Sequence, residues 1–438
     1  MSRKEVCINI QKEVNPHFQS VWTTKKPYNI LRGGRNSFKS SVISMLLVYK
    51  LLQFISRGEK ANIVVIRKVA NTLRDSVFLK IQWALDKFGM LDQFRPTVSP
   101  FKITHRGTGS SFFFYGQDDF QKLKSNDIGN IIAVWYEEAA EFDDSEEFDQ
   151  TNVTFMRQKH PSADNVLFFW SYNPPRNPYS WINEWSDSLV GEDGYLVHTS
   201  TYLDDRLGFI TPQMLADIKR IKANDYDYYR YLYLGEPVGL GTNVYNMNLF
   251  KPLLELPDDD PIVLIDISTD TGHQVSATTH GAFALTVKKK VILLDTYYYS
   301  PAGRVEKKAP SDLSEEYKAW LDGIRNKYNK PIDMMTIDSA EGALRNQVYK
   351  DYHIRMHPIA KGLKVDMIDN VHDLLARGRF YYLDRPNNQV FIEEHKKYQW
   401  DKDSLETSKP KVVEVDDHTC DMFIYYVNDN LRKLRLKY

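Results

Sequence analysis

The chain of 438 residues contains only two cysteines and no long run of apolar residues. Two cysteines are too few for a disulfide framework or for a zinc site built from cysteines. No uncharged apolar stretch approaches the roughly 20 residues that cross a bilayer, and the first residues lack the apolar core of a signal peptide. We therefore expect a protein of a reducing cytoplasm that is not part of a membrane.

The chain also lacks a net charge of either sign, because 57 Lys and Arg stand against 58 Asp and Glu and leave a formal net charge of −1. This balance excludes a global basic field, so any binding to nucleic acid has to rely on local patches. The length predicts two or three domains with sizeable cores.

The most informative segment is Leu31–Ser41, which reads LRGGRNSFKSS. It follows a short extended run and precedes an apolar segment that suits a buried helix. A glycine-containing loop between a strand and a helix that opens with Lys-Ser is typical of a phosphate-binding loop, in which Lys39 contacts the β- and γ-phosphates and Ser40 ligates Mg²⁺. Phe38 stands where the motif has its second glycine, so a chance Gly-Gly turn fits this segment alone equally well. The candidate nucleotide-binding residues of the loop are Gly33, Gly34, Arg35, Asn36, Ser37, Lys39 and Ser40.

Strands and helices alternate after this loop. Short β-branched or aromatic runs at 61–66, 111–115 and 166–170 indicate buried strands, and 71–88 has helical spacing. This alternation predicts an α/β domain with a doubly wound, mostly parallel sheet.

A further buried strand, 131–136, ends in two carboxylates. At the carboxyl edge of a parallel sheet such a pair suits a metal-assisted phosphate site. We assign Glu137 to the Mg²⁺ shell and Glu138 to the activation of the attacking water. The alternative is a solvated acidic turn, because acidic residues continue after Glu138; the preceding phosphate-binding loop favours the site.

The 166–170 strand leads into Ser171-Tyr172-Asn173-Pro174-Pro175. Ser171 and Asn173 are placed to contact the γ-phosphate or its water, although a proline turn alone explains Asn-Pro-Pro equally well.

A change of composition marks the domain boundary. Residues 238–260 contain glycines, prolines and an acidic run, which predicts a linker over 241–260. The first domain then covers 1–240, with a small helical subdomain near 200–240, and the second covers 261–438.

The second domain has the predicted order of an RNase H-like fold: a strand at 261–268, a hairpin over 281–298, a helix at 311–328 and a strand ending at Asp338. Asp266 lies within the first of these strands. A buried acid is costly unless it is paired or binds a metal, and two-metal cleavage of phosphodiesters uses clustered acids. The alternative is that Asp266 and Asp338 are ordinary acids at strand ends, each with its hydrogen bonds and charge satisfied by neighbouring groups.

The C-terminal helix is expected to supply the third acid. His418 and Asp421 are spaced i, i+3, and Asp417 and Asp421 are spaced i, i+4, so that these side chains share one helix face. A surface His–Asp pair is the more ordinary explanation of this pattern, and the sequence context favours a site.

Together these motifs resemble those of phage terminase large subunits. In the first half the resemblance rests on Gly33–Ser40, Glu137-Glu138, 171–175, 198–205 and 231–236. In the second half it rests on 336–341, 359–362, 394–400 and 417–425, so that it covers roughly residues 28 to 430. The chain departs from the family pattern at Phe38, where glycine is usual, and at Glu137, where Asp is commoner.

The resemblance implies a P-loop ATPase domain with ATP and Mg²⁺, followed by an RNase H-like nuclease domain with Mg²⁺ or Mn²⁺. By the family pattern, Asp266, Asp338 and Asp421 are the metal-binding, catalytic acids, and His418 lies beside them. Asp417 is a fourth candidate ligand. Lys361 is a candidate phosphate contact, for which an exposed structural lysine is the alternative.

The function implied by the resemblance is ATP-driven translocation of double-stranded DNA into a procapsid and cutting of concatemeric DNA, in the host cell cytoplasm during virus assembly. The implied partners are a portal protein, a small terminase subunit and further copies of the chain in a homo-oligomeric ring on the procapsid. Two other functions fit the residues: a helicase-like or DNA-remodelling ATPase with an inactive RNase H-like domain, and a plain ATP-binding interaction protein.

Overall fold

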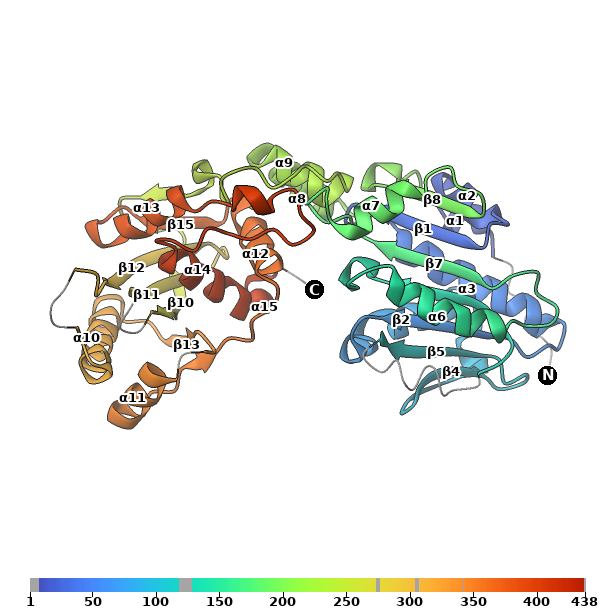
Figure 1. The fold of residues 1–438 in the computed structure, drawn as a ribbon, viewed down its shortest axis with the longest axis horizontal. Helices are drawn as coiled ribbons and strands as arrows, with labels where there is room; N and C mark the ends of the chain where they lie inside the picture. The colour runs from blue at the N-terminus through green and yellow to red at the C-terminus, as the bar shows by residue number, and fades with distance from the viewer. Residues whose placement is uncertain (1–7, 118–127, 273–275, 304–306, 341, 437–438) are drawn as a thin grey trace. The chain divides into compact units, whose positions relative to one another are not determined.

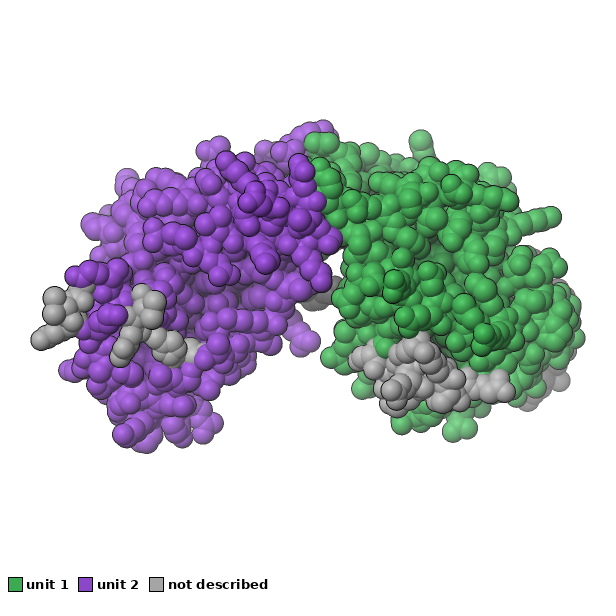
Figure 2. Space-filling model, viewed as in Figure 1, with its two compact units in different colours: residues 1–218, 229–239 green, residues 219–228, 240–438 purple. Residues whose placement is uncertain are grey.

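The computed structural model describes residues 8–117, 128–272, 276–303, 307–340 and 342–436, which form two compact units. Unit 1 comprises Met1–Ile218 and Tyr229–Gly239, and unit 2 comprises Lys219–Tyr228 and Leu240–Tyr438 (Figure 2). No helix among the described residues is long and apolar enough to cross a bilayer.

Residues 241–260, predicted as a linker, belong to unit 2 in the structure. Strand β9 (Lys251–Leu253) pairs with β15 (Phe380–Leu383), and the buried Tyr245 lies in the core of that unit. The acidic and proline-rich composition of this segment therefore reflects an edge strand and its turns.

The segment near 200–240, predicted as a helical subdomain, contains α8 (Pro212–Asn224) and α9 (Tyr226–Tyr229). Its middle part is counted in unit 2, where the Asn224 side-chain amide donates to the main-chain carbonyls of Leu375 and Ala376 at 3.1 and 2.9 Å. Its last part, from Tyr229, is counted in unit 1.

Unit 1 is built on an eight-stranded sheet in the order β3-β4-β5-β2-β6-β7-β1-β8, and only β3-β4 and β4-β5 pair antiparallel (Figure 1). The strands are β1 (Tyr28–Gly33), β2 (Asn62–Arg67), β3 (Phe94–Val98), β4 (Phe101–His105), β5 (Ser111–Gly116), β6 (Ile131–Glu137), β7 (Leu167–Tyr172) and β8 (Tyr195–Ser200). The helices that cover it are α3 (Lys39–Ser56), α4 (Leu79–Lys87), α6 (Glu146–Arg157) and α7 (Trp181–Ser188). The predicted doubly wound, mostly parallel α/β fold is confirmed.

Alternating side chains of the central strands explain why both faces of this sheet are covered. On β6, Trp135 packs with α3 and α4, whereas the next residue, Tyr136, packs with α6 on the opposite face. Strands buried on both faces read as continuous apolar runs, which is the pattern that the sequence has here.

Unit 2 contains a seven-stranded sheet in the order β14-β13-β10-β11-β12-β15-β9 (Figure 1). Its further strands are β10 (Ile262–Thr271), β11 (Thr278–Thr286), β12 (Val291–Tyr299), β13 (Ile332–Ile337) and β14 (His357–Pro358). Strands β10, β11 and β12 form an antiparallel meander, and β13 joins β10 in parallel, as the RNase H-like order predicts.

Helices pack on both faces of the second sheet. One face carries α10 (Pro310–Tyr328) and α11 (Ala343–Tyr352), and the other carries α12 (Lys364–Ala376), α13 (Gln389–Lys397) and α14 (His418–Asp429), which is followed by the short α15 (Leu431–Leu434). The buried face of α14 lies against β10 and β11, and this contact positions the side chains that α14 presents.

We predict opposite stability changes for two glycines of unit 2. A Cβ at Gly281 of β11 would lie 2.7 Å from Met422 Cε and 2.8 Å from Met422 Sδ, so Gly281→Val should overpack the contact with α14 and destabilise by about 1–3 kcal/mol. A Cβ at Gly323 of α10 meets nothing within 4 Å, so Gly323→Ala should stabilise by up to ~1 kcal/mol. Scanning calorimetry of the whole chain measures both; an unchanged melting temperature for Gly281→Val would show that α14 is not held as tightly as the structure indicates.

Candidate active sites

The first candidate site lies at the carboxyl edge of the unit 1 sheet. Strand register places Ser171 beside both Leu31 and Glu137, so the ends of β1, β6 and β7 meet there. A pocket of about 180 Å³ opens at this edge. Its lining residues are Gly34–Ser41, Glu137, Glu138, Ser171, Tyr172 and Asn173. The structure therefore brings together the residues that the sequence assigned to nucleotide and Mg²⁺ binding, with Gly33 immediately before them.

Both glycines of the loop are required by close packing. A Cβ at Gly33 would lie 1.8 Å from the carbonyl oxygen of Ser200, and one at Gly34 would lie 2.1 Å from that of Tyr233. The next residue, Arg35, donates its main-chain N–H to the carbonyl of Leu232 at 2.7 Å. The backbone can follow this path only without side chains at these two positions.

The side chain of Lys39 is buried inside the loop. Its ammonium group donates to the Gly33 and Gly34 carbonyls at 2.9 and 3.2 Å, and also to Ser37 Oγ at 2.8 Å and Asn173 Oδ1 at 2.9 Å. Burial lowers the pKa of Lys39 to about 8, against the opposing effect of nearby carboxylates. A buried cation with this set of partners is placed to bind a phosphate group.

The two acids that follow β6 have different surroundings. The Glu137 side chain is 12% exposed and forms an ion pair with Arg67, with 3.0 Å between Oε2 and Nε. Burial, and then the neighbouring Glu138, raise the pKa of Glu137. Glu138 has a left-handed backbone with φ 54°. Such strain in a non-glycine residue is common at functional sites, where the surrounding structure enforces it.

The Ser171–Asn173 segment contacts both the pocket and helix α7. Asn173 binds Lys39, and Ser171 Oγ accepts a hydrogen bond from Trp135 Nε1 at 2.9 Å. Tyr172 donates its hydroxyl to Ser186 Oγ of α7 at 2.6 Å. Two adjacent residues of this strand end therefore connect the pocket with α7: Asn173 contacts Lys39, and Tyr172 contacts Ser186 of α7.

Phe38 has a left-handed backbone, with φ 68° and ψ 0°, a conformation that glycine adopts without strain. Its ring centroid lies 6.0 Å from that of Phe209, and its side chain packs against the core between the sheet and α3. Phe38 therefore holds a backbone conformation that favours glycine while its ring packs into the core.

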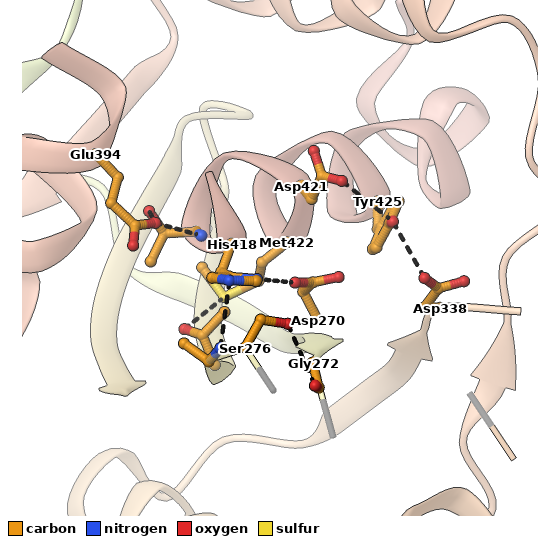
Figure 3. Close-up of polar contacts among 12 residues, drawn as sticks. Asp270, Gly272, Ser276, Asp338, Glu394, His418, Asp421, Met422 and Tyr425 are labelled. Carbon is orange, nitrogen blue, oxygen red and sulfur yellow. Dashed lines mark hydrogen bonds and ion pairs between the residues drawn. The ribbon is translucent and has the colours of Figure 1, made fainter. Parts of the chain in front are cut away.

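The second candidate site lies at the carboxyl edge of the unit 2 sheet. Register pairs Thr269 of β10 with Ile337 of β13, so that the residues that follow them, Asp270 and Asp338, are neighbours at the edge. Asp421 comes from α14. The hydroxyl of Tyr425 lies 3.4 Å from one carboxylate oxygen of each of Asp338 and Asp421 (Figure 3).

The charges of three nearby acids act on Tyr425. Burial, followed by the charges of Asp421, Asp270 and Asp338, raises the pKa of Tyr425 well above its ordinary value. Burial raises the pKa of Asp270 to about 6, and the charges of Asp421 and Asp338 act in the same direction. Burial, together with Asp421, also raises the pKa of Asp417 to about 6.

The structure does not bring Asp266 to these acids, contrary to the prediction. Helix α14 and the α15 helix after it run antiparallel to β10, so that Asp270 contacts His418, Ser268 contacts the carbonyl of Met422, and Asp266 contacts Lys433. Four strand residues amount to about 13 Å. Asp266 is a buried structural acid at 2.7 Å from Lys433, and burial raises its pKa to about 6.

Sequence reasoning missed Asp270 because the strand was expected to end at residue 268. Strand β10 continues to Thr271. The signal was present, since Thr269 and Thr271 are β-branched residues typical of strands, and ligands bind outside the carboxyl ends of parallel strands.

His418 uses both ring nitrogens in the structure. Nε2 accepts the main-chain N–H of Ala277 at 3.2 Å, which leaves the proton on Nδ1, and Nδ1 donates to Asp270 Oδ2 at 2.9 Å (Figure 3). Glu394 fixes the start of the same helix by accepting from the main-chain N–H and the hydroxyl of Thr419, both at 2.6 Å. His418 therefore orients Asp270.

Two lysines neutralise the other acids. Lys361 Nζ lies 2.7 Å from Asp338 Oδ2, and Lys364 forms an ion pair with Asp421. In this arrangement no three His, Cys, Asp or Glu side chains of the described residues are close enough to hold a metal ion. The donor chemistry nevertheless fits Mg²⁺ or Mn²⁺, because this edge presents carboxylates from two strand ends and a helix, and two of them already bind ammonium groups.

Known protein families match both units. Residues 25–236 match the family described as "Phage terminase large subunit", and residues 270–429 match "Terminase RNAseH like domain". The chain belongs to the phage terminase large-subunit family. The second match includes Asp270, Asp338 and Asp421.

Two curated relatives of this terminase chain are the large terminase subunit of Bacillus phage SPP1, 32% identical over 240 residues, and the PBSX phage terminase large subunit of Bacillus subtilis (strain 168), 37% identical over 133 residues. The matches cover 53% and 30% of this chain and span 55% and 29% of the relatives.

A solved large terminase from a thermophilic bacteriophage shares the fold of the terminase chain, with a TM-score of 0.76 at 19% identity over 95% of this chain and 99% of that one. The same thermophilic phage protein has also been solved with ADP, and that structure gives a TM-score of 0.74 at 20% identity over the same shares of the two chains.

We predict that the backbone conformation of Phe38 matters more than its ring. Phe38→Gly and Phe38→Val both remove the contact with Phe209, but only valine is β-branched and strained at positive φ, at a cost of about 1–3 kcal/mol. Calorimetric titration with ADP should give an affinity within about threefold of wild type for the glycine variant and a loss of about tenfold or more for the valine variant. Equal losses in the two variants would contradict this interpretation of the loop.

Asp266 and Asp270 allow a matched test of the acid site, because both lie on the same face of β10. We expect Asp270→Asn to weaken Mn²⁺ binding by about tenfold or more, since it removes a charged ligand, and Asp266→Asn to leave it within about threefold of wild type. Calorimetric titration of the full chain with Mn²⁺ measures both, and melting temperatures show whether the variants are folded. The reverse order of effects would restore Asp266 as the metal-binding acid.

Proposed function

We propose that this chain is the ATP-hydrolysing and DNA-cutting subunit of a phage packaging enzyme. The observation that carries the proposal is the presence of two separate sites in one chain of this family: the phosphate-loop pocket of unit 1, and the cluster of Asp270, Asp338 and Asp421 in unit 2.

In unit 1 the proposed reaction is ATP hydrolysis. The Lys39 ammonium group binds the β- and γ-phosphates in place of its present loop partners, and the loop N–H groups and the start of α3 complete the anion site. Ser40 and Glu137 would hold Mg²⁺, which supplies charge stabilisation at the phosphates. Glu138 orients and deprotonates water. Asn173 responds to the presence or loss of the γ-phosphate through its hydrogen bond with Lys39.

The Ser171–Asn173 strand end is also the proposed connection between hydrolysis and movement of DNA. Loss of the γ-phosphate changes the partners of Lys39 and Asn173, and Tyr172 passes this change to α7 through its hydrogen bond with Ser186.

In unit 2 the proposed reaction is hydrolysis of DNA phosphodiesters. Asp270, Asp338 and Asp421 would hold Mg²⁺ or Mn²⁺, which activates water and stabilises the leaving oxygen. His418 keeps Asp270 in position through Nδ1, and Asp417 adds negative charge to the site. Asp266 has no part in this site.

The proposed partners follow from the family. They are double-stranded DNA, a portal protein, a small terminase subunit and further copies of the chain in a ring on the procapsid, in the host cytoplasm during assembly. A remodelling ATPase with an inactive RNase H-like domain is not favoured, because an inactive domain has no need for three acids around Tyr425.

The ATPase assignment predicts distinct defects for two variants of the full chain. Lys39→Ala should lower nucleotide affinity and reduce ATP turnover by about 10²-fold or more, because the charge on the phosphates loses its buried partner. Glu138→Gln should still bind ATP but lower turnover by about 10²–10⁴-fold, as expected for loss of a general base.

Phosphate release with saturating ATP measures turnover, and ADP titration measures binding. Glu146→Gln, an exposed acid at the first residue of α6, is the matched control and should remain within about twofold of wild type. Unchanged turnover in Lys39→Ala would leave a plain nucleotide-binding protein as the better assignment.

A further inference from the structure

The lysines at the acid site are more open to solvent than the acids that they neutralise. The side chains of Lys361 and Lys364 are 41% and 34% exposed, whereas those of Asp338 and Asp421 are 14% and 19% exposed. In each pair the lysine is therefore the more solvent-accessible partner. A cation that binds the same carboxylate oxygen competes with the ammonium group.

Both lysines belong to residues 360–364, a segment that follows β14 and ends at the first residue of α12; residues 360–363 are exposed and Lys364 is half-buried. Gly362 has open space around it, since a Cβ there would meet nothing within 4 Å, and the large apolar side chain of Leu363 is 74% exposed. Lys361 also lies over the ring of Tyr425, with Nζ 5.3 Å from the centroid. Packing does not explain why this segment carries two lysines; their contact with the acid site does.

The position of Lys364 also favours a contact with an anion. It is the first residue of α12, and no side-chain hydrogen bond caps this helix at Leu363. A helix N-terminus is electropositive and disfavours a lysine, but it favours an anion. Asp421 supplies that anion in the present structure, and a phosphate group would supply it equally well.

We propose that segment 360–364 binds the phosphodiester backbone of double-stranded nucleic acid, and that Lys361 and Lys364 are exchangeable counterions. Without divalent cations they pair with Asp338 and Asp421; when cations bind these acids, the ammonium groups move to the phosphates. The proposal rests on the proposed nuclease function and adds the residues that connect metal loading with substrate binding.

Charge favours both halves of this exchange. An ammonium group and a divalent cation repel each other when they bind the same carboxylate, and ion pairs with a partly exposed lysine are weak enough to be broken. The flexible four-carbon chain of lysine allows a new partner within a few ångströms. Duplex DNA presents closely spaced negative charges that need cationic partners near the acids.

The exchange predicts effects of opposite sign for the double variant Lys361→Ala/Lys364→Ala in the full chain. Without DNA it should bind Mn²⁺ about fivefold more tightly, because the metal no longer competes with internal cations. With Mn²⁺ replaced by non-catalytic Ca²⁺, it should bind a DNA duplex more weakly, and the slope of log affinity against log salt should fall by about 2.

The matched control is Lys330→Ala/Lys350→Ala, which removes the same charge from exposed lysines of the same unit. It should leave Mn²⁺ affinity and the salt slope near wild type. Inorganic phosphate at millimolar concentration should compete poorly with the duplex; strong competition would make the segment a small-anion site and overturn the proposal.

Three further outcomes separate the exchange from the nuclease assignment. If wild type binds Mn²⁺ in a manner that Asp270→Asn removes, but the double variant shows unchanged or weaker Mn²⁺ binding, only the exchange is overturned. An unchanged salt slope for DNA in the double variant also overturns it. If wild type binds no Mn²⁺, the nuclease assignment and the exchange fail together.

Discussion

Strand register is the constraint on which both sites depend. Parallel pairing in unit 1 places the ends of β1, β6 and β7 side by side, and parallel pairing of β10 with β13 does the same for Asp270 and Asp338. At such an edge, loops and polar side chains can converge without interrupting the apolar core. A shift of one residue in either register would send these side chains to the opposite face of the sheet.

The second common feature is that charged groups at both sites have internal partners. Carbonyl and amide oxygens bind the ammonium group of Lys39, and two lysines bind Asp338 and Asp421. Because isolated buried charges are expensive, such partners let each site fold before its ligand arrives. The ligand then replaces existing interactions, and its affinity reflects the difference in free energy between the interactions that form and the interactions that break.

The sequence was sufficient for the architecture and for most of the first site. The loop from Gly33 to Ser40 and each apolar run are continuous stretches of the chain, and the polar residues of the site directly follow such runs, so local pattern was enough to predict them. The acid site depends on how far β10 extends and on how α14 aligns with it, which are tertiary properties. The pattern around Asp266, an acid inside an apolar run, was therefore assigned to metal binding although Lys433 neutralises it. Lys364 was missed for the same reason, because its partner lies 57 residues further along the chain.

The central claim is that the acids of unit 2 form one cation site at the edge of the sheet. Anomalous X-ray diffraction from crystals of the full chain grown with Mn²⁺ tests it most directly. We expect an anomalous peak bounded by Asp270, Asp338 and Asp421, with Lys361 and Lys364 moved away from the carboxylates. A peak beside Asp266, or none near these acids at saturating Mn²⁺, would contradict the account.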